Sequence, residues 1–221
     1  MLQTTLQKIN RKMLVRISVA VLGIAMTCVS VSAFYLIGLG SDPYQVFCVA
    51  VHQRLNISHG MANNLVNGVI ILFMLCFKRS YIKTSLFICL LTSGSFVDFF
   101  NALLTPVLSP ALPMVVKLCV MLAGCFLMGA GIFLYIAPEL GASPGDSMGL
   151  IVSDMVKRPY AQVRIGIDAF YTLVGFLLGA TVGITTLCSI LLTCPCIGLC
   201  KKWFENTAFI RSLKPEKAEL S

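Results

Sequence analysis

Charged residues are scarce in this sequence. Only 12% of the 221 residues are Asp, Glu, Lys or Arg, against roughly 25% in ordinary soluble domains. A water-soluble fold of this size needs a charged exterior, and 26 such residues grouped in short stretches cannot supply one. The composition therefore excludes a soluble globular protein. Hydrophobic residues make up 57% of the chain and the mean hydropathy is +0.89, so we expect the apolar surface to face lipid.

The sequence also lacks the residue patterns of the common enzyme classes. It has no Ser/His/Asp nucleophile set, no phosphate-binding loop, no dinucleotide-binding glycine fingerprint and no acidic pair spaced for hydrolysis. Cys194, Cys196 and Cys200 lie close together, but they belong to an apolar run without a second cysteine pair or a nearby His. We therefore expect no enzymatic activity, no metal site and no cofactor.

Six apolar runs have about the length that crosses a bilayer, whose hydrocarbon core of about 30 Å needs about 20 apolar residues per helix. They cover, approximately, Met13–Ile37, Met61–Phe77, Ile82–Leu104, Met114–Ile136, Ile165–Gly179 and Gly183–Leu199. The sequence predicts an all-α membrane protein with six transmembrane helices. Residues 1–221 then form a single polytopic membrane domain.

Basic residues outnumber acidic ones by 17 to 9, and most of them lie between the apolar runs. With a cytoplasmic N-terminus, six spans place fifteen of the seventeen Lys and Arg residues on the cytoplasmic side, in agreement with the positive-inside rule. We therefore expect both termini to be cytoplasmic. The excess of basic residues reflects topology and contact with the lipid bilayer, and we expect no binding to nucleic acid.

Two further segments, Pro43–Leu55 and Pro144–Val156, are too short to cross a bilayer. Each follows a similar turn, LGSDP in one case and LGASP in the other, with a Pro at the position where helices begin. Each segment is predicted to be a short helix. The pattern leaves open whether these helices lie in the membrane interface or enter the membrane part-way.

The chain repeats itself with a shift of 101 residues. Fourteen of the 86 pairs that start from residues 13–98 are identical, where composition alone would give roughly six. Each half contains one span, one short helix and two more spans, so three crossings per half predict an inverted-topology repeat. We place repeat 1 at about 10–105, repeat 2 at about 111–206 and a cytoplasmic tail at 207–221.

Polar side chains inside a membrane are costly, so each is a functional candidate. Arg164 and Asp168 are four residues apart and share one helix face, where they form an ion pair or present a charged site. The repeat sets Asn63 and Asn67 opposite them. These four residues are our predicted substrate-binding site. The alternatives are a structural ion pair for the charged residues and interhelical hydrogen bonds for the amides.

Four other polar residues are secondary candidates. Asp98 and Asn101 lie within the third apolar run. Asp42 and Asp146 lie near the starts of the two short helices. The N-terminus of a helix attracts anions, but an Asp at that place is more often the cap of the helix.

The paired turns, followed by PYAQVRIGIDAFYTLVGFLLGATVGITTL, resemble the YczE/YyaS/YitT group of bacterial membrane proteins. The matching positions in the second half are Leu140, Gly141, Pro144, Asp146, Val163, Arg164, Asp168, Gly175, Leu178, Gly179, Val182, Gly183 and Thr185. The chain departs from the pattern at Gln45, Ala180 and Ile184. The resemblance implies a multi-pass protein of the bacterial inner (plasma) membrane, and it implies no substrate.

These observations predict a small-solute secondary transporter or permease, with an anionic metabolite as the expected solute. Arg164 would bind an anionic group, and Asp168 would hold the Arg or carry a proton. The alternative is a non-transporting accessory protein that supports a membrane enzyme or biosynthetic complex. The expected partners are the lipid bilayer and an unidentified small solute, and the sequence leaves homodimer formation open.

Overall fold

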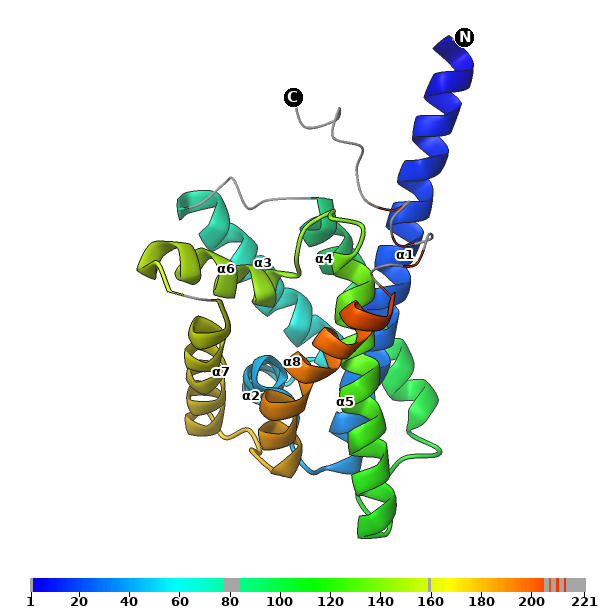
Figure 1. Cartoon of the computed structure of the whole chain (residues 1–221). Coiled ribbons are helices and arrows are strands. Elements are labelled where there is room, and N and C mark those ends of the chain that lie inside the picture. Colours follow the sequence, from blue (N-terminus) through cyan, green and yellow to red (C-terminus); the bar gives the residue numbers. More distant parts are fainter. Residues whose placement is uncertain are drawn as a thin grey trace.

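The computed structural model describes residues 2–77, 84–158 and 160–204, together with 207, 210 and 213. Within these residues the regular structure is entirely helical (Figure 1). The helices are α1 (Leu2–Ile37), α2 (Pro43–Leu55), α3 (His59–Phe77), α4 (Thr84–Leu104), α5 (Met114–Ile136), α6 (Pro144–Val156), α7 (Tyr160–Leu177) and α8 (Ile184–Phe204). The expectation of an all-α protein is confirmed for this part of the chain.

Five of the described helices are long and apolar enough to span a membrane. They are α1 from Lys12, α3, α4, α5 and α8. The remaining predicted span corresponds to α7, which does not reach the same apolar character, because Arg164 and Asp168 lie within it. The predicted start of the third run at Ile82 and most of the predicted tail, 207–221, lie outside the described residues.

The short helices α2 and α6 have the bounds that the sequence predicts. Each begins with a Pro, whose fixed φ suits the first helical turn. Each is followed by a C-cap residue in the left-handed conformation, Asn56 with φ 52° and Lys157 with φ 54°. The preceding turns contain Gly40 and Gly141 at φ 96° and 121°, which other residues adopt only with strain.

Helices α1 and α5 pack against each other and form the main core, while the N-terminal part of α1 projects beyond α5 (Figure 1). A Cβ atom on Gly23 would lie 2.6 Å from the backbone nitrogen of Tyr135, and one on Gly124 would lie 2.5 Å from the ring of Phe34. The two backbones can approach closely only because these positions are glycines. Higher-numbered residues of α1 meet lower-numbered residues of α5, so the two helices are antiparallel.

The two halves of the chain share one plan of elements. Helices α2 and α6 start and end 101 residues apart, and α3 and α7 start at His59 and Tyr160 with the same shift. Two hydrogen bonds join the halves reciprocally. The Thr185 amide donates to the Leu39 carbonyl and the Ser85 amide donates to the Leu140 carbonyl, both at 3.1 Å. The turn before each short helix thus contacts the start of the last long helix of the other half.

Candidate functional site

The four predicted site residues line one cavity of about 140 Å³. Asn63 and Asn67 reach it from α3, and Arg164 and Asp168 reach it from α7. Two secondary candidates, Asp42 before α2 and Asp146 in α6, line it as well. The tertiary structure therefore brings together polar residues that lie up to 126 positions apart in the chain.

The amide side of the cavity is closely hydrogen bonded. Asn63 and Asn67 are each only 3% exposed. The Nδ2 atoms of Asn63 and Asn67 donate to Ser93 Oγ at 3.1 and 3.3 Å, and the Tyr44 hydroxyl donates to Asn67 Oδ1 at 2.6 Å. This side thus contains the interhelical hydrogen bonds that the sequence offered as one interpretation.

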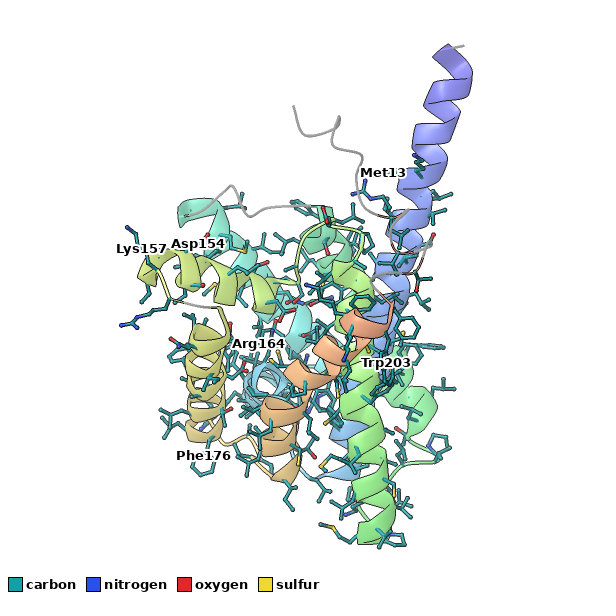
Figure 2. All side chains as sticks on the ribbon, in the orientation of Figure 1. Met13, Asp154, Lys157, Arg164, Phe176 and Trp203 are labelled. Carbon is teal, nitrogen blue, oxygen red and sulfur yellow. The ribbon has the colours of Figure 1, made fainter. Side chains whose placement is uncertain are left out.

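The charged side of the cavity centres on Arg164, which Figure 2 places beside α2 on the inner side of the fold. Its Nη1 atom lies 2.8 Å from Asp146 Oδ1, while its Nε atom lies 3.7 Å from Asp168 Oδ2. The expected pairing with Asp168 exists, but the shorter contact is to Asp146. The other oxygen of Asp146 accepts hydrogen bonds from the hydroxyls of Tyr135 and Ser143.

Both short helices begin at this cavity. The ring of Tyr44 lies against Gly145, where a Cβ atom would be 3.2 Å from the ring, so the first turns of α2 and α6 meet. Ser143 caps α6 by accepting from the Asp146 amide at 3.3 Å. Asp42 occupies the corresponding place before α2 and makes no capping hydrogen bond. In α6 the cap is thus Ser143 and not Asp146, whereas Asp42 does occupy the N-cap position of α2.

Asp42 has a different character from the other polar residues of the cavity. Its Oδ1 atom is buried and has no hydrogen-bond partner among the described residues. A buried carboxylate oxygen without a partner is costly. Asp42 is one of the residues that line the cavity.

Asp98 and Asn101 do not line the cavity. Asp98 accepts hydrogen bonds from the Gly60 amide at 2.8 Å and from the Ser58 hydroxyl at 2.7 Å. It therefore holds the start of α3, which is a structural role. Asn101 lies in the last turn of α4, where its Oδ1 atom is buried without a partner. The structure separates both residues from the predicted site.

A model of a protein family matches residues 14–202, and that family is described as a family of unknown function, DUF6198. The chain belongs to this family. It is 26% identical over 155 residues to the uncharacterized membrane protein YczE of Bacillus subtilis (strain 168), which covers 70% of each chain. It is 26% identical over 170 residues to an uncharacterized protein of Haemophilus influenzae, covering 77% of this chain and 76% of the relative. No solved structure matches.

These relatives confirm the YczE-like resemblance and the assignment of this DUF6198 chain as a membrane protein.

The sequence reasoning missed Tyr44, Tyr135, Tyr171 and Ser93, which also line the cavity. A Tyr or Ser in an apolar run is most often a packing residue, so nothing in the sequence distinguished them. For Tyr44 the one usable signal is its position directly after the Pro that starts α2.

Proposed function

We propose that this protein is a small-solute secondary transporter, with the central cavity as its solute site. The observation that carries the proposal is the cavity itself, which polar and charged residues from both halves of the chain line. Ionisable residues inside membrane proteins are expensive and characteristically mark solute or ion pathways. A fully hydrogen-bonded interior would fit the accessory-protein alternative better, but the buried Asp42 oxygen has no partner among the described residues.

The proposed architecture is an inverted repeat of two three-span halves, with α7 as the sixth span. The antiparallel packing of α1 and α5, the shared element bounds and the reciprocal bonds to Leu39 and Leu140 support it. A two-fold axis that exchanges the halves would produce each of these features. The charged residues of α7 line the cavity, so they need not face lipid and do not argue against a spanning position.

The short helices support a transport role as well. In inverted-repeat transporters the solute site lies between the repeats and is formed by discontinuous helices whose ends point at it. Here the first turns of α2 and α6 contact each other and line the cavity. Movement of one half against the other around this point would expose the cavity to each side in turn.

We further propose that the protein lies in the bacterial inner membrane with both termini in the cytoplasm. The distribution of Lys and Arg between the apolar runs supports this orientation. In it, the turn before α2 is nearer the outer side and the turn before α6 is nearer the inner side, as an inverted repeat requires.

Counterflow in proteoliposomes tests the transport proposal. The full chain is reconstituted with a panel of labelled alkylammonium ions, amino acids, carboxylates and sugars. We expect accumulation of at least one solute, and at least a tenfold slower initial rate in Asp168→Asn. This substitution keeps the side-chain shape and changes a residue whose ion pair is long, 3.7 Å, so folding should persist.

Asp154→Asn is the matched control, because Asp154 is exposed on α6 (Figure 2) and does not line the cavity. We expect it to retain the wild-type rate. Absence of counterflow for every solute, or equal rates in the two variants, would contradict the proposal.

A further inference from the structure

We infer that the cavity takes a small organic monocation with an ammonium headgroup, which contacts Asp42 and Asp168. This inference rests on the proposed function, because it assigns a ligand class to the same cavity. It differs from the sequence-based expectation of an anionic solute, and the charges that line the cavity are the reason.

The described residues around the cavity include more acidic than basic side chains. Asp42, Asp146 and Asp168 provide three carboxylates, and Arg164 provides one guanidinium. The N-termini of α2 and α6 each add roughly half a positive charge. With all three carboxylates ionised, the balance is about one negative charge. A monocation would neutralise this balance, whereas an anion would double it.

Arg164 is already engaged and is a poor anion site. Its Nη1 atom lies 2.8 Å from Asp146, and Asp168 lies 3.7 Å from its Nε atom. An incoming anion would have to displace Asp146, whose second oxygen is held by Tyr135 and Ser143. The Arg164–Asp146 pair therefore acts as one neutral unit of the wall, and the excess charge falls on Asp42 and Asp168.

Asp42 and Asp168 are the carboxylates with unfilled bonding capacity. Asp42 Oδ1 is buried without a hydrogen-bond partner. The Asp168 contact at 3.7 Å is longer than a charge-assisted hydrogen bond, which measures about 2.7–2.9 Å. An ammonium group has donors to offer to both residues and carries the opposite charge. Its binding would offset the cost of burying these carboxylates.

The rest of the wall favours an organic body over a bare ion. The rings of Tyr44 and Tyr171 pack edge to face at 5.5 Å beside the cavity, and tyrosine faces attract organic cations. Ile24, Ile132 and Ile167 add apolar surface. Within the described part of the chain, no group of three or more His, Cys, Asp or Glu side chains is arranged to hold a metal ion.

The size of the cavity limits the ligand. An engineered cavity of about 150 Å³ holds benzene, and this cavity measures about 140 Å³. A ring of five or six carbon atoms that carries one ammonium group matches this volume. Cyclopentylammonium is therefore a suitable probe, and cyclopropanecarboxylate is an anion with the same number of non-hydrogen atoms.

Titration calorimetry on the purified full chain in detergent tests the inference, with empty micelles as the blank. We expect cyclopentylammonium to bind and cyclopropanecarboxylate to bind at least tenfold more weakly or not at all. Asp42→Asn should weaken cyclopentylammonium binding at least tenfold, because a charge-assisted contact is lost. Asp154→Asn removes a carboxylate that is remote from the cavity and should leave the Kd unchanged.

Several outcomes would overturn the inference: stronger binding of the carboxylate, saturable binding of sodium or potassium chloride without cyclopentylammonium binding, no binding of the amine, or equal Kd values in Asp42→Asn and Asp154→Asn. Size-exclusion elution and thermal midpoint establish that both variants are folded, and Asp168→Asn provides a second test of the same headgroup site. Cation binding without counterflow would contradict the transport proposal and support the ammonium ligand class. Counterflow of an anion without cation binding would support transport and contradict the ammonium ligand class.

Discussion

The two halves of the chain contribute opposite chemistry to one cavity. The first half supplies the amides of Asn63 and Asn67, which are hydrogen bonded to Ser93. At the positions 101 residues later, the second half has Arg164 and Asp168. Asp42 is the one charged residue that the described first half adds to the lining.

This difference shows how a repeated frame can produce an asymmetric site. The amide side satisfies its polar atoms internally, so it fixes the packing of α3 and α4 at little electrostatic cost. The charged side brings Arg164 together with Asp146 and Asp168, so its cost depends on how these charges pair. Positions that are equivalent in the repeat therefore need not have equivalent roles. Substitutions in the two halves should lower the free energy of unfolding by different amounts.

The largest expected effect follows from breaking the charged side. Arg164→Ala leaves Asp146 without its cationic partner, and the two side chains are only 20% and 14% exposed. We expect a loss of about 2–3 kcal/mol in the free energy of unfolding, somewhat below the value for a fully buried pair. Unfolding in mixed micelles with increasing SDS measures it.

The control for this prediction is the double variant Arg164→Ala with Asp146→Ala, which leaves neither member of the pair behind. It should be less destabilised than the sum of the single variants. If the two single effects add strictly, the Arg164 and Asp146 side chains do not interact. That result would contradict the interpretation of these two residues as one ion pair.

A second prediction concerns the pH dependence of ligand binding, which we expect to follow the protonation of Asp42 in the first half. Asp42 lies in the turn between α1 and α2, and burial, reinforced by the negative charge of Asp168, raises the pKa of its carboxyl to about 7 against the opposing effect of Arg164. The titratable groups around it are Tyr35 of α1, Cys48 of α2, Cys125 of α5, Asp146 of α6, and Arg164 and Asp168 of α7.

Because the raised pKa leaves Asp42 protonated below about pH 7, cyclopentylammonium affinity should fall as the pH decreases through that value, approaching tenfold per pH unit. Calorimetric Kd values between about pH 5.5 and 8.5 measure this dependence. Asp42→Asn should remove the part of the slope centred near pH 7. An unchanged slope in that variant would assign the titration to another group.

The smallest effect is expected on the amide side. Asn67→Ala removes the acceptor of the Tyr44 hydroxyl and one donor to Ser93, which keeps its bond from Asn63. Interhelical hydrogen bonds in membrane proteins contribute about 0.6 kcal/mol on average, so we expect a loss of about 1 kcal/mol by the same SDS titration. A loss as large as that of Arg164→Ala would contradict the contrast between the halves.

The elements themselves were largely predictable from the sequence. Pro43–Leu55 and Pro144–Val156 form helices with the predicted bounds, because a starting Pro and a change in polarity mark their ends. The run Met114–Ile136 also forms the helix expected. The apolar run that starts at about Ile165 covers only part of α7, which begins five residues earlier at Tyr160, because an apolar run does not reveal the polar turn that precedes it.

The site was predictable only in part. The scarcity of polar residues in the apolar runs identified Asn63, Asn67, Arg164 and Asp168, all of which reach the cavity. The same reasoning proposed Asp98, which instead holds the start of α3. It also predicted the contact between Arg164 and Asp168, which exists at 3.7 Å. It missed the shorter contact of Arg164 with Asp146, because periodicity reveals partners within a helix and carries no information about partners on another helix.

Composition and periodicity alone determined that this chain is helical, that it belongs in a membrane, and that a few polar residues interrupt its apolar runs. These properties depend on local sequence and on the cost of polar groups in lipid. Only the tertiary structure decided that Asp146 pairs with Arg164, that the buried Oδ1 atom of Asp42 has no hydrogen-bond partner among the described residues, and that three carboxyl groups and one guanidinium line the same cavity. Charge balance depends on which side chains meet in space, and helices far apart in the sequence supply them.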